Sequence, residues 1–188
     1  MKRIARLFPL LMLLSVSALA QMAKPSDATR TIAQVLDGSL TNVEGEFVSA
    51  ADAMPEDKYG FAPSNGEFKG VRTFAQQVKH VAAVNYIVGS VILGEKSPVD
   101  IGGENGPDSI KSKADIVKFL KDSFAYAHKA VATIDEKNVV APIKNPFGEA
   151  STTRLGMGTV FAWHSMDHYG QIVEYLRMNG IIPPASRR

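Results

Sequence analysis

Apolar residues recur at intervals of three and four along four segments of the chain, and loops rich in Gly, Pro and Asn separate these segments. In the first segment the spacing is formed by Ile32, Leu36, Leu40, Val43, Phe47 and Ala50. Such a period is typical of a helix with one apolar face. The sequence therefore predicts helices over residues 27–53, 71–93, 111–135 and 152–179. Four helices of roughly 20 to 28 residues predict an all-α fold, a four-helix bundle.

Residues near the segment ends agree with this assignment. Ser26 or Asp27 is a suitable N-cap for the first helix, and Pro55 marks its end. Gly180 is the expected C-cap of the last helix, and the two prolines that follow prevent its continuation. The second segment is apolar around much of its circumference, which predicts a well-buried helix. Its β-branched residues would also suit a strand, but its length and its polar opening QQVKH favour a helix.

The first 20 residues, MKRIARLFPLLMLLSVSALA, have the pattern of a secretory signal peptide. A basic start precedes a short apolar run, and Ala18-Leu19-Ala20 is a small-x-small cleavage signal. A buried N-terminal helix is the alternative, which the basic start and this ending disfavour. The apolar run is too short for a stable membrane anchor, and no cysteine follows it for lipid attachment. We expect cleavage after residue 20, one domain over residues 21–188, and a periplasmic or secreted location.

Removal of this leader changes the charge of the protein. The chain has 21 basic and 19 acidic residues, and the leader contains three basic and no acidic ones, which leaves a net charge of about −1. No basic stripe remains that would indicate binding to nucleic acid or to an anionic membrane. The absence of cysteine excludes disulfides and thiol catalysis. We expect a small-molecule substrate as partner, and neither nucleic acid nor a stable membrane anchor. Whether the chain forms a homodimer is left open by the sequence.

Two histidines in the fourth segment, His164 and His168, are four positions apart and therefore lie one turn apart on one helix face. The same face includes Gln171, Ile172 and Tyr175, so we expect it to point into the bundle. Buried imidazoles need polar partners, and one metal ion would satisfy both. The alternative is a pair of ordinary histidines that bond neighbouring carboxylates, for which Asp167 and Glu174 are available.

A third ligand would come from another helix. His80 lies on the buried second segment, where it is either a ligand or a core histidine bonded to a backbone carbonyl. His128 lies next to Lys129 in the third segment, and we interpret it as an edge or surface histidine. Spacing alone makes a three-histidine site plausible without establishing it.

Beyond these patterns, the sequence resembles the DinB-like family, also called DinB/YfiT-like metalloenzymes. The resemblance lies in a lone histidine in the second segment, QQVKHVAAVNY, followed far downstream by HSMDHYGQIVEYLRMNGIIPPAS. The latter is similar to the family's H-x-x-x-H-x-G-Q segment and to the tail that follows it, which here reads YLRMNGIIPPAS. The loop MPEDKYGFAP also looks like the family's connection between its first two helices, and the similarity extends over residues 47–186.

The resemblance implies an up-down-down-up bundle and a divalent metal ion, commonly zinc or nickel, held by His80, His164 and His168. It also implies that Gln171 orients an imidazole by hydrogen bonding and that Gly170 allows close helix packing. Tyr169 stands where the family often has Arg, which puts any role of that Arg in substrate binding in doubt. Characterised relatives include transferases that use low-molecular-weight thiols of the cytoplasm, so thiol transfer does not suit an exported chain.

Three neutral imidazoles would leave a divalent ion with an open coordination position, which suits hydrolysis or Lewis-acid-assisted transfer. The sequence offers no clear general base, because Asp167 points away from the ligand face and we interpret it as a rim carboxylate. Trp163 and Tyr175 either line a pocket or belong to the core, and GGENG (102–106) is interpreted as a turn.

Three functional hypotheses follow. The first is an exported metal-dependent hydrolase or transferase of unknown substrate, and the second is a non-catalytic bundle with a structural or sequestered ion. The third is a metal-free bundle that binds a partner through an exposed helix face. A pocket open to the ion would favour the first hypothesis, and an enclosed fourth ligand would favour the second.

Overall fold

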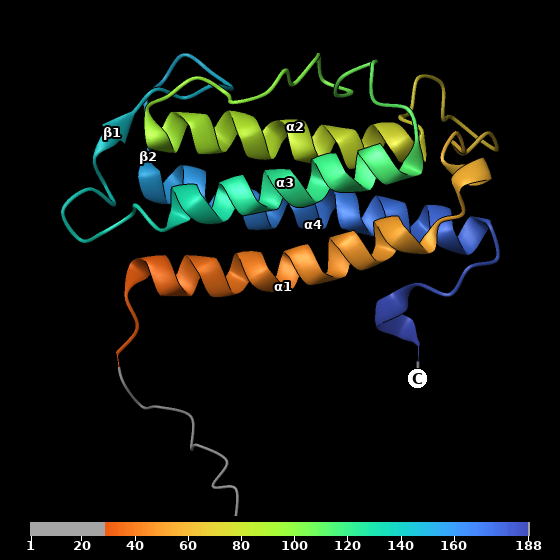
Figure 1. Cartoon of the computed structure of the whole chain (residues 1–188), viewed down its shortest axis with the longest axis horizontal. Helices are drawn as coiled ribbons and strands as arrows, with labels where there is room; N and C mark the ends of the chain where they lie inside the picture. The colour runs from red at the N-terminus through yellow and green to blue at the C-terminus, as the bar shows by residue number, and fades with distance from the viewer. Residues whose placement is uncertain (1–28, 188) are drawn as a thin grey trace, which may run out of the picture.

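The computed structural model describes residues 29–187 and contains the four predicted helices (Figure 1). They are α1 (Ile32–Ala53), α2 (Phe74–Leu93), α3 (Lys113–Val131) and α4 (Arg154–Met178). A short 3₁₀ turn, η1 (Glu56–Lys58), lies between α1 and α2, and a second, η2 (Pro184–Ser186), follows α4. The two-residue strands β1 (Pro142–Ile143) and β2 (Thr152–Thr153) pair antiparallel before α4. The all-α prediction is therefore confirmed.

Every helix starts later than predicted, because local capping residues fix each start. The side-chain oxygens of Thr31, Thr73, Ser112 and Thr153 accept bonds from backbone N–H groups in the first turns of α1 to α4. In α1 and α2 a glutamine completes a capping box. The predicted caps at residues 26 and 27 lie outside the described residues, and Thr29 and Arg30 are not helical.

The end of α4 also differs by one position from the prediction. Asn179 is the C-cap, and Gly180 follows it with a φ of +73°, a left-handed conformation that glycine adopts without strain. The third helix ends at Val131, four residues before the predicted end. Its last predicted turn is replaced by tighter turns around Asp135, whose carboxylate accepts bonds from the backbone of Lys137 and Asn138.

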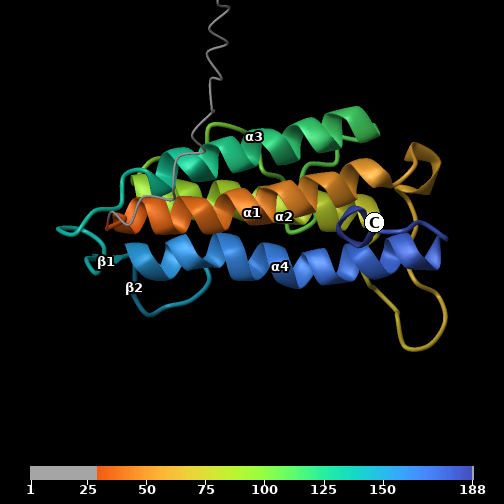
Figure 2. The same ribbon diagram turned by 90° about the horizontal axis from the view of Figure 1, so that it is seen from below.

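The helices form an up-down-down-up bundle, as the resemblance implied (Figures 1 and 2). Helices α1 and α4 run in one direction, and α2 and α3 run in the other. Because α2 and α3 are parallel neighbours, the chain must return along the bundle between them, and residues 94–112 do so over the outer side of α2. We call this connection the crossover segment.

The core lies between all four helices, and α2 is its most buried element. Fourteen of the 20 residues of α2 are buried, as its apolar circumference predicted. Each helix contributes one phenylalanine to the centre of the core. These residues, Phe47, Phe74, Phe124 and Phe161, are at most 2% exposed. Gly89 lets α3 approach α2, because a Cβ there would lie 2.7 Å from the ring of Tyr126. The antiparallel contact between α2 and α4 is the part of this core that positions the histidines.

None of the helices within residues 29–187 is sufficiently long and apolar to cross a lipid bilayer. The predicted signal peptide lies outside the described residues.

Candidate metal centre

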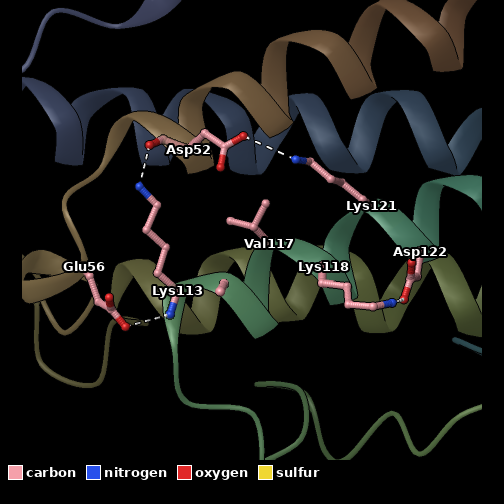
Figure 3. Close-up of a pocket in the computed structure, with 8 residues that line it drawn as sticks. Asp52, Glu56, Lys113, Val117, Lys118, Lys121 and Asp122 are labelled. Carbon is pink, nitrogen blue, oxygen red and sulfur yellow. Dashed lines mark hydrogen bonds and ion pairs between the residues drawn. The ribbon is translucent and has the colours of Figure 1, made fainter.

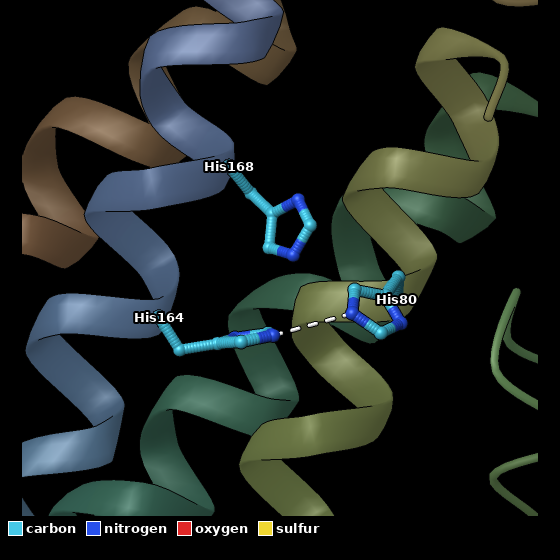
Figure 4. A group of neighbouring side chains, drawn as sticks. All are labelled: His80, His164 and His168. Atoms are coloured by element: carbon cyan, nitrogen blue, oxygen red, sulfur yellow. Dashed lines mark hydrogen bonds between the residues drawn. The ribbon is translucent and has the colours of Figure 1, made fainter. Parts of the chain in front are cut away.

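The three predicted ligand residues meet between α2 and α4 (Figure 4). His80 projects from α2, and His164 and His168 project from α4 one turn apart. Each offers one ring nitrogen, and these three atoms lie within 4.8 Å of one another. The Nε2 atoms of His80 and His164 are 3.2 Å apart. Two nitrogens bound tetrahedrally to one zinc ion at about 2.0–2.1 Å would be roughly 3.3 Å apart, so this spacing suits two ligands of one ion.

The hydrogen bonds of His80 and His168 leave one nitrogen of each ring free. The Nδ1–H of His80 donates to the backbone carbonyl of Glu104, and the Nδ1–H of His168 donates to Oε1 of Gln77 at 2.7 Å. Both acceptors are carbonyl oxygens, so both Nδ1 atoms must be protonated. Each Nε2 then has a lone pair, which is the form of imidazole that binds metals.

His164 is the ring whose hydrogen bonding is incomplete. Its Nδ1 is buried and has no hydrogen-bonding partner among the described residues, and its Nε2 faces the Nε2 of His80. A buried ring nitrogen without a partner is destabilising, and in the tautomer that leaves a lone pair on each Nε2 the two facing lone pairs repel each other. A cation between these rings would remove the repulsion, so the donor set fits a divalent metal ion.

Burial keeps the three imidazoles neutral. Desolvation lowers the pKa of His164 to about 3 and that of His168 to about 4, and it also lowers the pKa of His80. The neighbouring imidazoles add to the shifts at His164 and His168, and the positive charge of Arg72 lowers the pKa of all three. At neutral pH all three lone pairs are therefore available without proton loss.

Comparison with known proteins identifies a family and solved structures that are similar to this chain. The model of the DinB superfamily matches residues 39–172, a span that includes all three histidines. The chain belongs to the DinB superfamily. A DinB-like protein from Bacillus cereus ATCC 10987 has a similar structure, with a TM-score of 0.63 at 15% identity over 84% of this chain and 98% of that one. An uncharacterized protein from Clostridium difficile 630 gives a TM-score of 0.58 at 11% identity, over 80% and 99% of the two chains. No curated protein matches the sequence.

Gln171 acts on the site of this DinB-superfamily chain through another glutamine, and this refines the sequence prediction. Its Oε1 accepts a 2.7 Å bond from Nε2 of Gln77, and Gln77 in turn holds the ring of His168. The Nε2 of Gln171 donates to the carboxylate of Asp167 at 3.4 Å. Because a carboxylate only accepts, this series fixes both amide orientations and the tautomer of His168. Gln77 was missed, although it lies three residues before His80 on the same helix face.

The carboxylates that the alternative interpretation offered to the histidines have other partners. Asp167 is exposed and contacts Gln171, as expected of a rim carboxylate. Glu174 is exposed and pairs with Arg177. Gly170 is exposed, and a Cβ there would meet nothing within 4 Å, so the expected close packing at this glycine is wrong.

The crossover segment holds His80 from outside the helix pair. GGENG forms a turn, as predicted, and the backbone carbonyl of its Glu104 orients His80. Next to it, the buried Nζ of Lys79 donates to the carbonyl of Pro107 at 2.7 Å and to that of Ile110 at 3.3 Å. Burial lowers the pKa of Lys79. Gly106 lies against Lys79, so close that a Cβ there would be 2.5 Å from the Cβ of Lys79.

A cavity of about 710 Å³ opens beside the histidines. His80 and His164 line it together with residues of α2, the crossover segment, the loop between β1 and β2, and α4. Trp163 lines this cavity and is 60% exposed, so it belongs to the pocket. Tyr175 belongs to the core, since it is 4% exposed and its hydroxyl donates to the backbone carbonyl of Arg72. The volume is typical of a small-molecule site.

A second hollow, of about 530 Å³, lies among α1, η1 and α3 and has a different character (Figure 3). Its charged side chains neutralise one another: Lys121 pairs with Asp52, and Lys118 pairs with Asp122. Lys113 donates from Nζ to the backbone carbonyl of Asp52. No free charge converges on a common point among the residues drawn there, so this hollow is a surface between ion pairs.

The fourth histidine is apart from the site, as predicted. His128 lies on α3 and contacts two carboxylates of α1, Asp37 through Nδ1 and Glu44 through Nε2. These contacts join α3 to α1 on the side of the bundle away from α2 and α4.

Proposed function

We propose that this chain is an exported metal-dependent enzyme, a hydrolase or transferase that acts on a small molecule. The observation that supports it most is the convergence of three imidazoles on one point at the wall of an open cavity. We further propose that His80, His164 and His168 bind one divalent ion, with zinc or nickel as the preferred metals. Imidazole nitrogen suits both metals.

Each ligand has a distinct role in this proposal. The Glu104 carbonyl and Gln77 fix the rings of His80 and His168, so little orientation entropy is lost when an ion binds. The Nε2 of His164 faces that of His80 at 3.2 Å, so the two atoms would share the ion. When bound, a divalent ion would supply Lewis-acid chemistry of the kind that hydrolases and transferases use.

The position of the cavity favours catalysis over a structural ion. A structural zinc site is closed by four protein ligands, whereas a catalytic site leaves a position to the substrate. Among the described residues, three ligands gather here, and two of them line the cavity. A substrate in the cavity would therefore be adjacent to the ion.

The alternative is a non-catalytic bundle in which the ion is either stored or stabilises the fold. It is favoured by the poor supply of proton-transfer groups, since Glu104 is the one carboxylate among the described residues lining the cavity and it pairs with Arg72. We therefore assign no catalytic residue of the protein.

A periplasmic or secreted location is part of the proposal and rests on the first 20 residues alone. Export would separate the protein from cytoplasmic thiol cofactors, which is why we prefer hydrolysis or another transfer over thiol transfer.

The metal content of the chain beginning at Gln21, purified without a histidine tag, tests this proposal. Elemental mass spectrometry should find about one zinc or nickel ion per chain. The variants His80→Gln and His164→Gln should lose the ion, because two imidazoles form a much weaker site. His128→Gln is the matched control, since it removes the fourth histidine outside the site and should retain the ion.

A protein that takes up neither zinc nor nickel when these are added would contradict the metal proposal. Equal loss of metal in His128→Gln would show that the variants act by unfolding the bundle. A loaded protein that turns over no ester, amide or phosphoester would favour the non-catalytic alternative.

A further inference from the structure

The cavity beside the histidines is polar at one end and apolar along the rest of its length. Residues His80, Val84 and Ile87 follow one another along α2, and a rise of 1.5 Å per residue places Ile87 about 10 Å from His80 along the axis. On the antiparallel α4, His164, Val160 and Met157 follow the same direction. The histidines therefore lie at one end of a channel whose walls on α2 and α4 beyond them are aliphatic, and Asn145 of the loop between β1 and β2 adds one polar side chain to the lining.

Two exposed aromatic side chains border this channel. Trp163 is 60% exposed and Phe147, from the loop between β1 and β2, is 54% exposed, although both line the cavity. Large apolar side chains at the rim of a pocket are typical of a site for an apolar ligand.

At the polar end, positive charge would be in excess once the proposed ion is bound. Arg72 lines the cavity there, and its Nη2 pairs with Glu104 at 3.2 Å while its Nε donates to Asn105 at 2.9 Å. The Glu104 side chain is 88% exposed, so this ion pair is weak and open to exchange. Three neutral imidazoles do not compensate a divalent ion, so the ion and Arg72 together outweigh one exposed carboxylate.

We propose that the ligand of this cavity is an amphipathic monoanion, with a carboxylate between Arg72 and the histidine cluster and an acyl or aryl body along the channel towards Ile87 and Met157. The binding of the head to the ion rests on the proposed function. The contact with Arg72 and the apolar body rest on the cavity alone. Arg72 is thus a specificity-determining residue, and Trp163 covers the body of the ligand.

Three probes separate head from body: 4-phenylbutyrate has both, 4-phenylbutan-1-ol has the body alone, and acetate has the head alone. Each is titrated calorimetrically into zinc-loaded and metal-free protein. We expect 4-phenylbutyrate to bind the zinc-loaded protein at least about tenfold more tightly than either other probe, because a charge-assisted contact and apolar burial each contribute about one order of magnitude.

Two variants assign these contributions to residues. In metal-free protein Arg72→Gln should abolish the preference for the acid over the alcohol, with little effect on the alcohol. Trp163→Ala should weaken acid and alcohol alike, by about threefold to tenfold. Met178→Ala is the control for Trp163→Ala, because Met178 is an exposed apolar residue of α4 that does not line the cavity, and it should change neither affinity.

The outcomes separate this inference from the proposed function. If the protein takes up no zinc but binds 4-phenylbutyrate with dependence on Arg72 and Trp163, the ligand class is supported and the metal proposal fails. The ligand class is overturned if the acid and the alcohol bind equally well to both the zinc-loaded and the metal-free protein. It is also overturned if neither Arg72→Gln nor Trp163→Ala changes the affinities. Both results hold even for a protein that binds zinc.

Discussion

At the scale of single residues, the candidate site depends on which atom holds each ring in place. Of the two glutamines in the series, Gln77 touches a ligand residue and Gln171 does not. Gln77 comes from α2 and holds a ring of α4, so it links the two helices that form the site. Its contribution to the site should exceed that of Gln171.

We predict that Gln77→Leu weakens zinc binding by about 10- to 100-fold, the usual effect of removing the acceptor that orients a ligating histidine. Gln171→Leu should have a smaller effect, since Gln77 can still accept from His168. Competition with a chromophoric zinc chelator measures both affinities. A larger loss in Gln171→Leu than in Gln77→Leu would contradict the series of hydrogen bonds described above.

At the scale of elements, the crossover segment is a structural part of the site and more than a connection. It supplies the carbonyl that orients His80, and Lys79 and Gly106 hold it against α2. The two contacts with α2 involve consecutive residues, 79 and 80, so a displaced crossover would affect both at once.

We predict that Gly106→Ala lowers the free energy of unfolding by about 2–4 kcal/mol, because its φ of +74° strains an L residue and the new Cβ would collide with Lys79. It should also weaken zinc binding through His80. Gly103→Ala is the matched control in the same turn, since a Cβ there meets nothing within 4 Å. Urea unfolding of both variants tests this, and equal stability of the two would show that the close approach is unimportant.

The sequence predicted the helices well and their starts less well, for a physical reason. Periodicity reports the buried face of a helix, whereas the start is decided by one side chain, such as Thr31 or Thr73, that satisfies free N–H groups. The pair His164 and His168 follows from spacing along one helix. Spacing left open whether His80 is a ligand or a core histidine, and the resemblance to a family decided it.

The contacts that orient the rings were beyond prediction from spacing. Glu104 is 24 residues from His80 along the chain, and its side chain has no part in the contact, which uses a backbone carbonyl that every residue has. The path of the crossover segment alone brings it there. The same holds for the carboxylates of α1 that meet His128, which are 84 and 91 residues away.

At the scale of the whole molecule, the buried histidines make stability depend on pH. In the unfolded chain their pKa is about 6.5, whereas in the folded chain that of His164 falls to about 3 and that of His168 to about 4. Below pH 6.5 the unfolded chain therefore binds protons that the folded chain does not. Their contribution to stability is complete above pH 6.5 and is lost as the pH falls.

We predict that metal-free protein loses up to about 2.7 kcal/mol of unfolding free energy per pH unit near pH 5 through these two groups. Urea unfolding in the presence of a chelator, between pH 7.5 and pH 4.5, measures the slope. The double variant His164→Asn, His168→Gln is the reference and should show a shallower slope. Parallel slopes in the two proteins would contradict the burial of neutral imidazoles.

The direct contact between His80 and His164 joins residues 84 positions apart, and His164 lies on the last long helix. A ribosome releases α2 long before α4, and a chain threaded through a membrane emerges in the same order. The complete set of three nitrogens exists only after α4 has docked. If the chain is exported and binds an ion as proposed, the ion would therefore be taken up in the compartment where folding ends, from the metals present there.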